Sequence, residues 1–118
     1  MMTEEISTAK LIVFEGSDWC VNCIQLEKNV LSDKAFIEFS QKNEIEIERI
    51  DFPQRTKQTK ETERYNAEMA EKYQFDGIFP TVILLDEKTN ELIKIPNSIH
   101  NTSEDFLNFI QEKISIEE

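Results

Sequence analysis

Cys20 and Cys23 are the residues of this chain best suited to chemistry, and the chain has no other cysteine. They stand three positions apart where an apolar run gives way to a helical pattern. Both then lie on one side of a helix start, close enough to form a disulfide within one turn. The dipole and the free N–H groups at a helix N-terminus stabilise a thiolate. We therefore expect thiol-disulfide exchange with Cys20 as the nucleophile.

In that chemistry Cys20 attacks the disulfide of a partner, and Cys23 resolves the mixed disulfide by attacking Cys20. Two other interpretations of the pair stay open. One is half of a zinc site, for which the chain offers only these cysteines and His100, so that a second chain would have to supply ligands. The other is a structural disulfide or two buried thiols.

The elements before and after the cysteines must hold them in place. Residues 10–15 form a short apolar run that predicts a buried strand, followed by a turn at residues 16–18. Ser17 or Asp18 can cap the helix that follows. The apolar positions of this helix recur at helical spacing: Cys23, Leu26, Val30 and Leu31.

The rest of the chain alternates between helical and strand patterns. Ser32 and Asp33 can cap a second helix, whose candidate core residues are Phe36, Ile37 and Phe39. Residues 45–52 predict a strand, and residues 53–63 predict a loop or a solvated helical extension. A helix carrying Tyr65, Met69 and Tyr73 should follow.

Two strands and a helix complete the pattern. Residues 81–85 and 91–95 flank a turn-rich segment and predict an antiparallel hairpin. Thr102 or Ser103 can cap the last helix, whose inner face is Phe106, Leu107, Phe109 and Ile110. We expect one α/β domain over residues 1–118.

Two motifs together resemble the thioredoxin family: Trp19-Cys20-Val21-Asn22-Cys23 after one apolar strand, and Ile78-Phe79-Pro80-Thr81 before another. In that family the proline is cis and faces the cysteine pair. The resemblance implies that Pro80 is this proline and that Phe79 pairs its backbone with a bound peptide. Trp19 would be a partly exposed platform beside Cys20, although packing against the core is compatible with its position.

Within the family, residues 17–21, Leu26-Glu27-Lys28 and Asp51-Phe52-Pro53 most resemble two groups. These are small bacterial thioredoxin-like proteins and the C-terminal domain of DsbD-type thiol reductases. The resemblance covers residues 10–113. It implies a thioredoxin-like α/β fold in its minimal form, a four-stranded mixed sheet of order 2-1-3-4 flanked by helices.

The chain departs from this family at the proton acceptor. Thioredoxins carry a buried Asp six residues before the first cysteine, and here that position is Phe14. Glu15 alternates to the opposite face of the strand, which makes it a poor substitute. Glu27 is the better candidate, because it projects between Cys20 and Cys23 on a helical wheel and the reductase domains have a Glu there. Such a carboxylate would have a raised pKa and accept the Cys23 proton. The alternative is a solvated helix residue.

The charge and the hydropathy of the chain argue against several classes of binding partner. The net charge of −11 opposes binding to nucleic acid or to anionic lipid. No apolar run approaches the ~20 residues of a membrane-spanning helix. The N-terminus lacks the basic start and apolar stretch of a signal peptide, so the sequence as written predicts a cytoplasmic protein, or a periplasmic one if a leader has been trimmed. We expect a monomer without cofactor or metal.

The functional expectation is a disulfide reductase or electron relay that acts on protein disulfides and dithiols and is recharged by an upstream thiol reductant. An isomerase or oxidase is the near alternative, since potentials of such pairs span ~−270 to ~−120 mV. A binding module that holds peptides near Pro80 without turnover is a second. The basic residues of the 53–64 segment, Arg55, Lys57, Lys60 and Arg64, form either a docking rim or a solvated helix start.

Overall fold

The computed structural model describes residues 9–87, 90–97 and 102–115, so His100 lies outside the described part. Four strands form a single mixed sheet of order β2-β1-β3-β4, which confirms the expected order. The strands are β1 (Ala9–Glu15), β2 (Glu46–Asp51), β3 (Thr81–Asp86) and β4 (Glu91–Ile95). β1 runs parallel to β2 and antiparallel to β3, and β3 and β4 form the expected hairpin.

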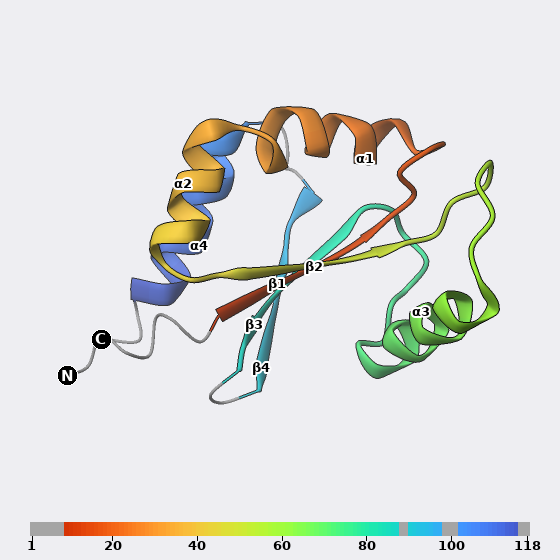
Figure 1. Cartoon of the computed structure of the whole chain (residues 1–118). Helices are drawn as coiled ribbons and strands as arrows, with labels where there is room; N and C mark the ends of the chain where they lie inside the picture. The colour runs from red at the N-terminus through yellow and green to blue at the C-terminus, as the bar shows by residue number, and fades with distance from the viewer. Residues whose placement is uncertain (1–8, 88–89, 98–101, 116–118) are drawn as a thin grey trace.

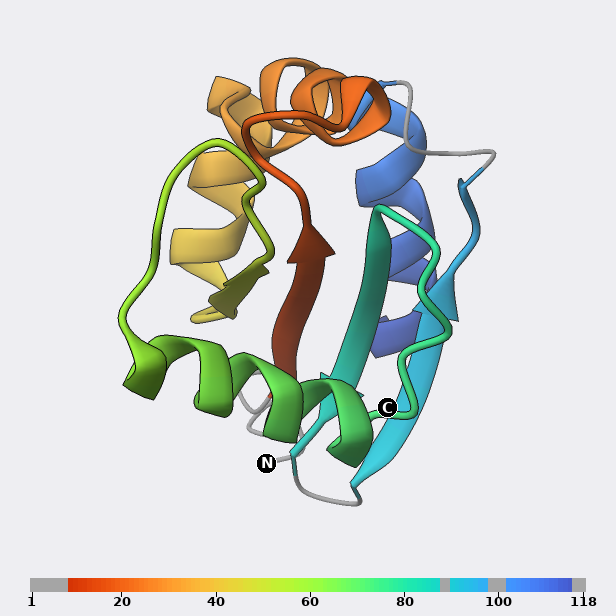
Figure 2. The ribbon, with the colours of Figure 1, turned by 90° about the vertical axis from the view of Figure 1, so that its right-hand side faces the viewer.

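Helices cover both faces of this sheet (Figures 1 and 2). On one face, called here the α1 face, lie α1 (Val21–Leu26), the π-helical turn η2 (Glu27–Leu31), α2 (Lys34–Lys42) and α4 (Ser103–Ser115). The other face, called the α3 face, is covered by α3 (Lys60–Lys72). No helix in the described ranges is long and apolar enough to cross a membrane.

Strand alternation divides the core in two, because successive side chains of a strand point to opposite faces. Leu11 and Val13 of β1 face the α1 face and pack among residues of η2, α2 and α4. Ile12 and Phe14 face the α3 face and pack against Met69 and its neighbours on α3. β1 and β3 are buried on both sides of the sheet, which is why their sequences are almost continuously apolar.

Most of the expected helix ends are found. Asp33 caps α2 by accepting the N–H of Ala35, and Thr102 accepts the N–H of Asp105 before α4. Residues 53–63 divide between a loop and a helix start, since Thr59 caps α3 and the helix begins at Lys60.

Ile37 was expected in the core, and this prediction is wrong. Its side chain is 40% exposed, whereas Phe36 and Ser40 of the same helix are buried. The two buried positions are four residues apart and share one face of α2. Ile37 is rotated by one residue, about 100°, away from that face.

Candidate active site

Cys20 itself caps α1. Ser17 and Asp18 were the expected caps, and this prediction is wrong. Cys20 has an extended backbone with φ −90° and ψ 112°, and its Sγ accepts the N–H of Cys23 at 3.2 Å. The Cys20 N–H donates to the carbonyl of Gly16 at 2.9 Å, which closes the turn between β1 and α1. This turn places the Cys20 sulfur over the free amides of the helix start.

Ser17 and Asp18 instead fasten the turn to the segment after β2. The backbone N–H and the hydroxyl of Ser17 donate to the Asp51 carboxylate at 2.8 and 2.6 Å. Asp18 accepts the N–H groups of Gln54 and Arg55, both at 2.9 Å. These hydrogen bonds lower the pKa of Asp18. The turn is therefore held by two carboxylates, a role that local sequence patterns did not indicate.

Trp19 is half-buried and anchored at both ends. Its indole Nε1–H donates to the carbonyl of Phe52 at 2.7 Å. Its ring lies edge-on to Phe79, with 5.2 Å between ring centroids. Next to it, Gly16 has no room for a side chain, because a Cβ there would lie 2.4 Å from the indole. Glycine is needed at this position for close packing.

The segment containing Phe79 and Pro80 therefore lies beside the cysteine turn. The Phe79–Pro80 peptide bond is cis, and Pro80 is buried. Phe79 also packs edge-on against Phe52 and Phe75, at centroid distances of 5.7 and 5.0 Å. The structure thus brings together the predicted residues Trp19, Phe79 and Pro80 around an aromatic cluster.

The two thiols are free in this structure and differ in their surroundings. Cys20 is 7% exposed and Cys23 is 2% exposed. Burial and the hydrogen bond with Cys20 raise the pKa of Cys23 to about 12, and the N–H of Gly16, 3.4 Å from the sulfur, opposes this only in part. Cys23 at neutral pH is a protonated thiol, so its attack on Cys20 requires a base.

Glu27 is the first residue of η2, and its carboxylate is bound by polar side chains. Its side chain is 41% exposed and pairs with Arg49, while the Ser32 hydroxyl donates to its other oxygen. Partial burial raises the pKa of Glu27, but the bonds from Ser32 and Arg49 outweigh it and leave the pKa lowered. The expected raised pKa is wrong.

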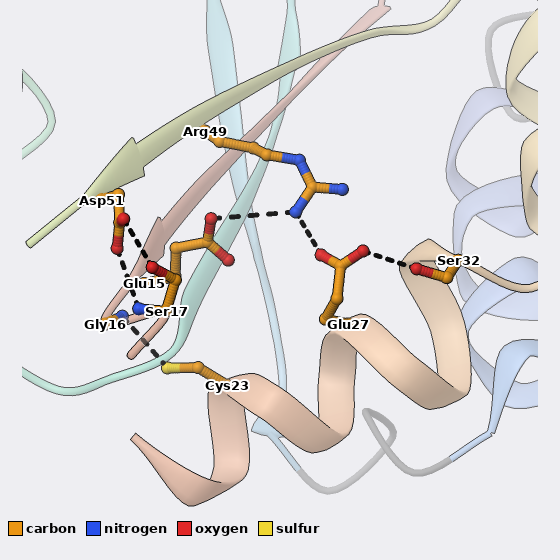
Figure 3. Close-up of polar contacts among 8 residues, drawn as sticks. All are labelled: Glu15, Gly16, Ser17, Cys23, Glu27, Ser32, Arg49 and Asp51. Atoms are coloured by element: carbon orange, nitrogen blue, oxygen red, sulfur yellow. Dashed lines mark hydrogen bonds and ion pairs between the residues drawn. The ribbon is translucent and has the colours of Figure 1, made fainter. Parts of the chain in front are cut away.

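The lowered pKa follows from the partners that Glu27 gains. The Ser32 N–H donates to the Glu27 carbonyl at 2.8 Å, a bond that spans five residues, and the Ser32 hydroxyl donates to the Glu27 carboxylate. Arg49 comes from β2, which a helical wheel of this segment does not include. Figure 3 shows the Glu27 carboxylate directed at Arg49 and Ser32.

Glu15 is the carboxylate that was expected to be a poor substitute for the buried Asp of thioredoxins. It does alternate away from Phe14, but the face it points to is the one that carries α1 and Cys23. It is 6% exposed, and this burial raises its pKa, while the Arg49 guanidinium at 3.7 Å opposes the rise. The ionised Glu15 in turn contributes to the raised pKa of Cys23. Strand alternation in the sequence places Glu15 on the face opposite Phe14. The sequence does not indicate that α1 packs on that face.

No cluster of three or more potential metal-binding side chains is found among the residues that the structure describes.

Comparison with known proteins places this geometry in a family. Residues 3–113 match the sequence profile of the family described as "Thioredoxin-like domain". The chain belongs to the thioredoxin-like family. The resemblance seen in the two motifs is thereby confirmed.

One curated thioredoxin-like relative is the "Disulfide bond reductase DsbH" of Chlamydia pneumoniae, 30% identical over 84 residues. The match covers 71% of this chain and 49% of that protein, so the chain spans about half the length of the curated relative.

Solved structures support the thioredoxin-like fold. A structure titled "DsbH Oxidoreductase" superposes with a TM-score of 0.79 at 21% identity, over 97% of this chain and 77% of the other. A thioredoxin from Thermus thermophilus gives 0.59 at 18% identity, over 89% and 72%. Protein BF1870 of Bacteroides fragilis, of unknown function, gives 0.55 at 18% identity, over 92% and 84%.

Proposed function

We propose that this chain is a thiol-disulfide oxidoreductase that works as a disulfide reductase or electron relay through Cys20 and Cys23. The observation that carries the proposal is the contrast between the two thiols at one helix start. Cys20 caps α1 and is 7% exposed, whereas Cys23 is 2% exposed and its pKa is raised to about 12. A division of labour between an attacking and a resolving thiol needs this contrast.

The reaction proceeds in two exchanges. The Cys20 thiolate attacks one sulfur of a partner disulfide, the partner's S–S bond breaks, and its other sulfur leaves and takes up a proton. Cys23 then loses its proton and attacks the Cys20 sulfur, which releases the partner as a dithiol and leaves a Cys20–Cys23 disulfide. Two electrons have passed to the partner, and an upstream thiol reductant restores the pair.

The substrate-binding residues of the proposal are Trp19, Phe79 and Pro80. Trp19 and Phe79 are in ring contact, so the peptide segment before β3 adjoins the nucleophile. Val21 and Ile78 are exposed apolar side chains near these residues in the chain. An extended protein segment carrying the disulfide would lie on this surface, with its backbone paired to Phe79.

Glu27 belongs to the proposal as a residue of the proton-handling step. Its carboxylate is bound by Arg49, which also approaches the buried Glu15. Replacing Glu27 with Gln should slow resolution of the mixed disulfide. Unchanged reduction kinetics across pH would remove Glu27 from the mechanism.

The reductase direction is supported by the Chlamydia pneumoniae relative, which is a disulfide bond reductase. A reduction potential measured against glutathione tests it. We expect a value near or below ~−270 mV, which would match a reductase, whereas a value above ~−180 mV would indicate an oxidase or isomerase.

Reduction of insulin by dithiothreitol tests the redox assignment itself. The chain should accelerate it, Cys20→Ser should abolish the acceleration, and Cys23→Ser should accumulate a mixed disulfide visible by mass spectrometry. A Cys20→Ser variant that retains the full acceleration contradicts the proposal and leaves a peptide-binding module as the alternative.

A further inference from the structure

Three charged side chains form one connected group on the α1 face, above the cysteine helix (Figure 3). Arg49 Nη1 lies 3.7 Å from Glu15 Oε2 and is hydrogen-bonded to Glu27 Oε1. Glu27 is held from its other side by the Ser32 hydroxyl. The guanidinium therefore joins a buried carboxylate on β1 to a half-exposed carboxylate on η2.

The sheet register explains why these residues meet. In the parallel β1–β2 pair, Val13 is opposite Arg49 and Glu15 is opposite Asp51. Odd-numbered residues of both strands point to the α1 face, as Leu11 and Val13 do. Arg49 thus reaches along the end of β1 toward Glu15, with η2 across from it.

Glu15 is also tied to the resolving thiol through its neighbour in the chain. The N–H of Gly16 donates to the Cys23 sulfur at 3.4 Å. The side chain of Glu15 is nearly as buried as Cys23, and the two groups interact electrostatically. A proton that moves from the thiol to this carboxylate leaves the buried site with one negative charge before and after the transfer, so no second charge has to be buried.

We propose that Arg49 is a positioning residue for the resolving step, which holds Glu15 in place as the base for Cys23 and is itself anchored by Glu27. This inference rests on the proposed function. The Cys23 S–H proton is taken up by the Glu15 carboxylate. The Cys23 thiolate attacks the Cys20 sulfur, the bond from Cys20 to the partner breaks, and the partner sulfur leaves with both electrons of that bond and takes up a proton.

The groups that face Glu15 set the sign of the pH effects. Arg49 and Asp51 approach from β2, and Cys23 and Glu27 from the helical side. Arg49 favours the carboxylate, while Asp51 and Glu27 disfavour it. Loss of the guanidinium therefore shifts the protonation of Glu15 to higher pH and leaves less of the base ionised at neutral pH.

The test uses the reduced full chain and 5,5′-dithiobis(2-nitrobenzoate), followed by rapid mixing from pH 5 to 9. The first thionitrobenzoate released reports the attack of Cys20, and the second reports resolution by Cys23. Glu15→Gln, which keeps the shape of the side chain, should slow the second phase by at least ~100-fold, the usual contribution of a general base, with the first phase unchanged.

Arg49→Gln should move the pH profile of the second phase to higher pH, and each unit of displacement slows that phase about tenfold on its rising limb. Arg49→Lys, which keeps the charge, should lie between this variant and the wild type. In the Arg49→Gln background, Glu27→Gln should no longer slow the second phase, because Glu27 supports the base only through Arg49 and the loss of its own charge favours the Glu15 carboxylate. The control is Arg64→Gln, the same charge change on the exposed surface of α3, which should leave both phases unchanged.

The outcomes separate the two proposals. Absence of the first phase in the wild type would overturn the proposed function. A normal first phase with a second phase that is insensitive to Glu15→Gln, or with the wild-type pH profile in Arg49→Gln, would overturn this inference and leave the function standing. A Glu27→Gln effect that persists in full without Arg49 would assign the base to Glu27 instead.

Discussion

Phe14 and Glu15 are neighbours at the end of β1, yet they build opposite environments on the two faces of the sheet. Phe14 is fully buried on the α3 face and stacks on Phe75 with 4.5 Å between ring centroids. Glu15 is buried on the α1 face beside Arg49. One step of strand alternation therefore divides the site into an aromatic half, which supports the Trp19 and Phe79 surface, and an ionic half beside the resolving thiol.

Fold stability and proton handling therefore depend on different side chains in this molecule. The apolar contacts of Phe14 on the α3 face are made by aliphatic and aromatic side chains and do not involve Glu15, Cys23 or Arg49. Changes there should therefore alter the free energy of unfolding and leave pH profiles in place. Changes at Glu15 and Arg49 should shift the pH profiles and alter the free energy of unfolding less, because Arg49 is partly exposed and its ion pair with Glu15 is screened by solvent. The predictions below test this separation.

The largest effect is expected for Phe14→Ala. Removing a fully buried aromatic ring should lower the free energy of unfolding by about 3–5 kcal/mol, measured by urea denaturation. The pH profile of the resolving phase should remain that of the wild type. Phe14→Leu, with a smaller cavity, provides the same comparison if the alanine variant does not fold. A displaced pH profile in the leucine variant would contradict the separation.

Gly16→Ala should come next, at about 1–3 kcal/mol, since the new Cβ would lie 2.4 Å from the indole of Trp19. The indole must move, which should also change the fluorescence of this single tryptophan. Gly77→Ala is the control: its φ of +86° makes alanine strained there, but no atom lies within 4 Å of the added carbon. That variant should keep the wild-type fluorescence, and a Gly16→Ala protein that does so too would refute the close packing.

Alkaline pH should destabilise the reduced protein through Cys23. The thiol ionises near 9 in the unfolded chain and about 12 in the folded one, so the folded state retains a proton that the unfolded state releases. Stability should therefore fall as pH rises from 9 toward 12, by up to about 1.4 kcal/mol per unit for this one group. Cys23→Ala should lack this part of the slope. Equal slopes for the two proteins would show that Cys23 is not buried as described.

The smallest effect on stability is expected for Glu15→Gln. Because burial raises the pKa of Glu15, ionisation in the folded state costs stability at pH values above its ordinary range. The variant should match the wild type at pH 4 and gain at most about 1 kcal/mol by pH 7, measured by thermal unfolding at both pH values. A large loss at pH 7 would mean that the Glu15–Arg49 pair stabilises the fold, contrary to the comparison.

Sequence patterns were enough for the strands and the place of the cysteines, because the apolar runs and the motifs around Cys20 and Pro80 are local. The order of the strands followed from the family resemblance that these motifs carry. Burial of Phe36 and exposure of Ile37 depend on how α2 rotates against the sheet, which no pattern within the helix decides. The same holds for Ser17 and Asp18, whose partners at residues 51–55 are distant in the chain.

The residues around the Cys23 proton were the hardest to predict from the sequence. Strand alternation correctly places Glu15 opposite Phe14, but the strand sequence does not indicate which of the two faces carries the cysteine helix. Arg49 carries no local signal at all, since only the β1–β2 register brings it to Glu15. The helical wheel that favours Glu27 covers one helix, whereas the pKa of Glu27 is lowered by the Ser32 hydroxyl and by Arg49 of β2.

The hydrogen bonds that fasten the turn before the cysteines have a consequence for folding. The bonds from Ser17 to Asp51 and from Asp18 to Gln54 and Arg55 join residues 34 to 37 positions apart. Closing so long a loop costs chain entropy, and the contacts that offset this cost form only once β2 is paired with β1. A peptide containing the cysteine motif alone would lack this shape, so the reactivity of Cys20 is a property of the assembled sheet and emerges late in folding.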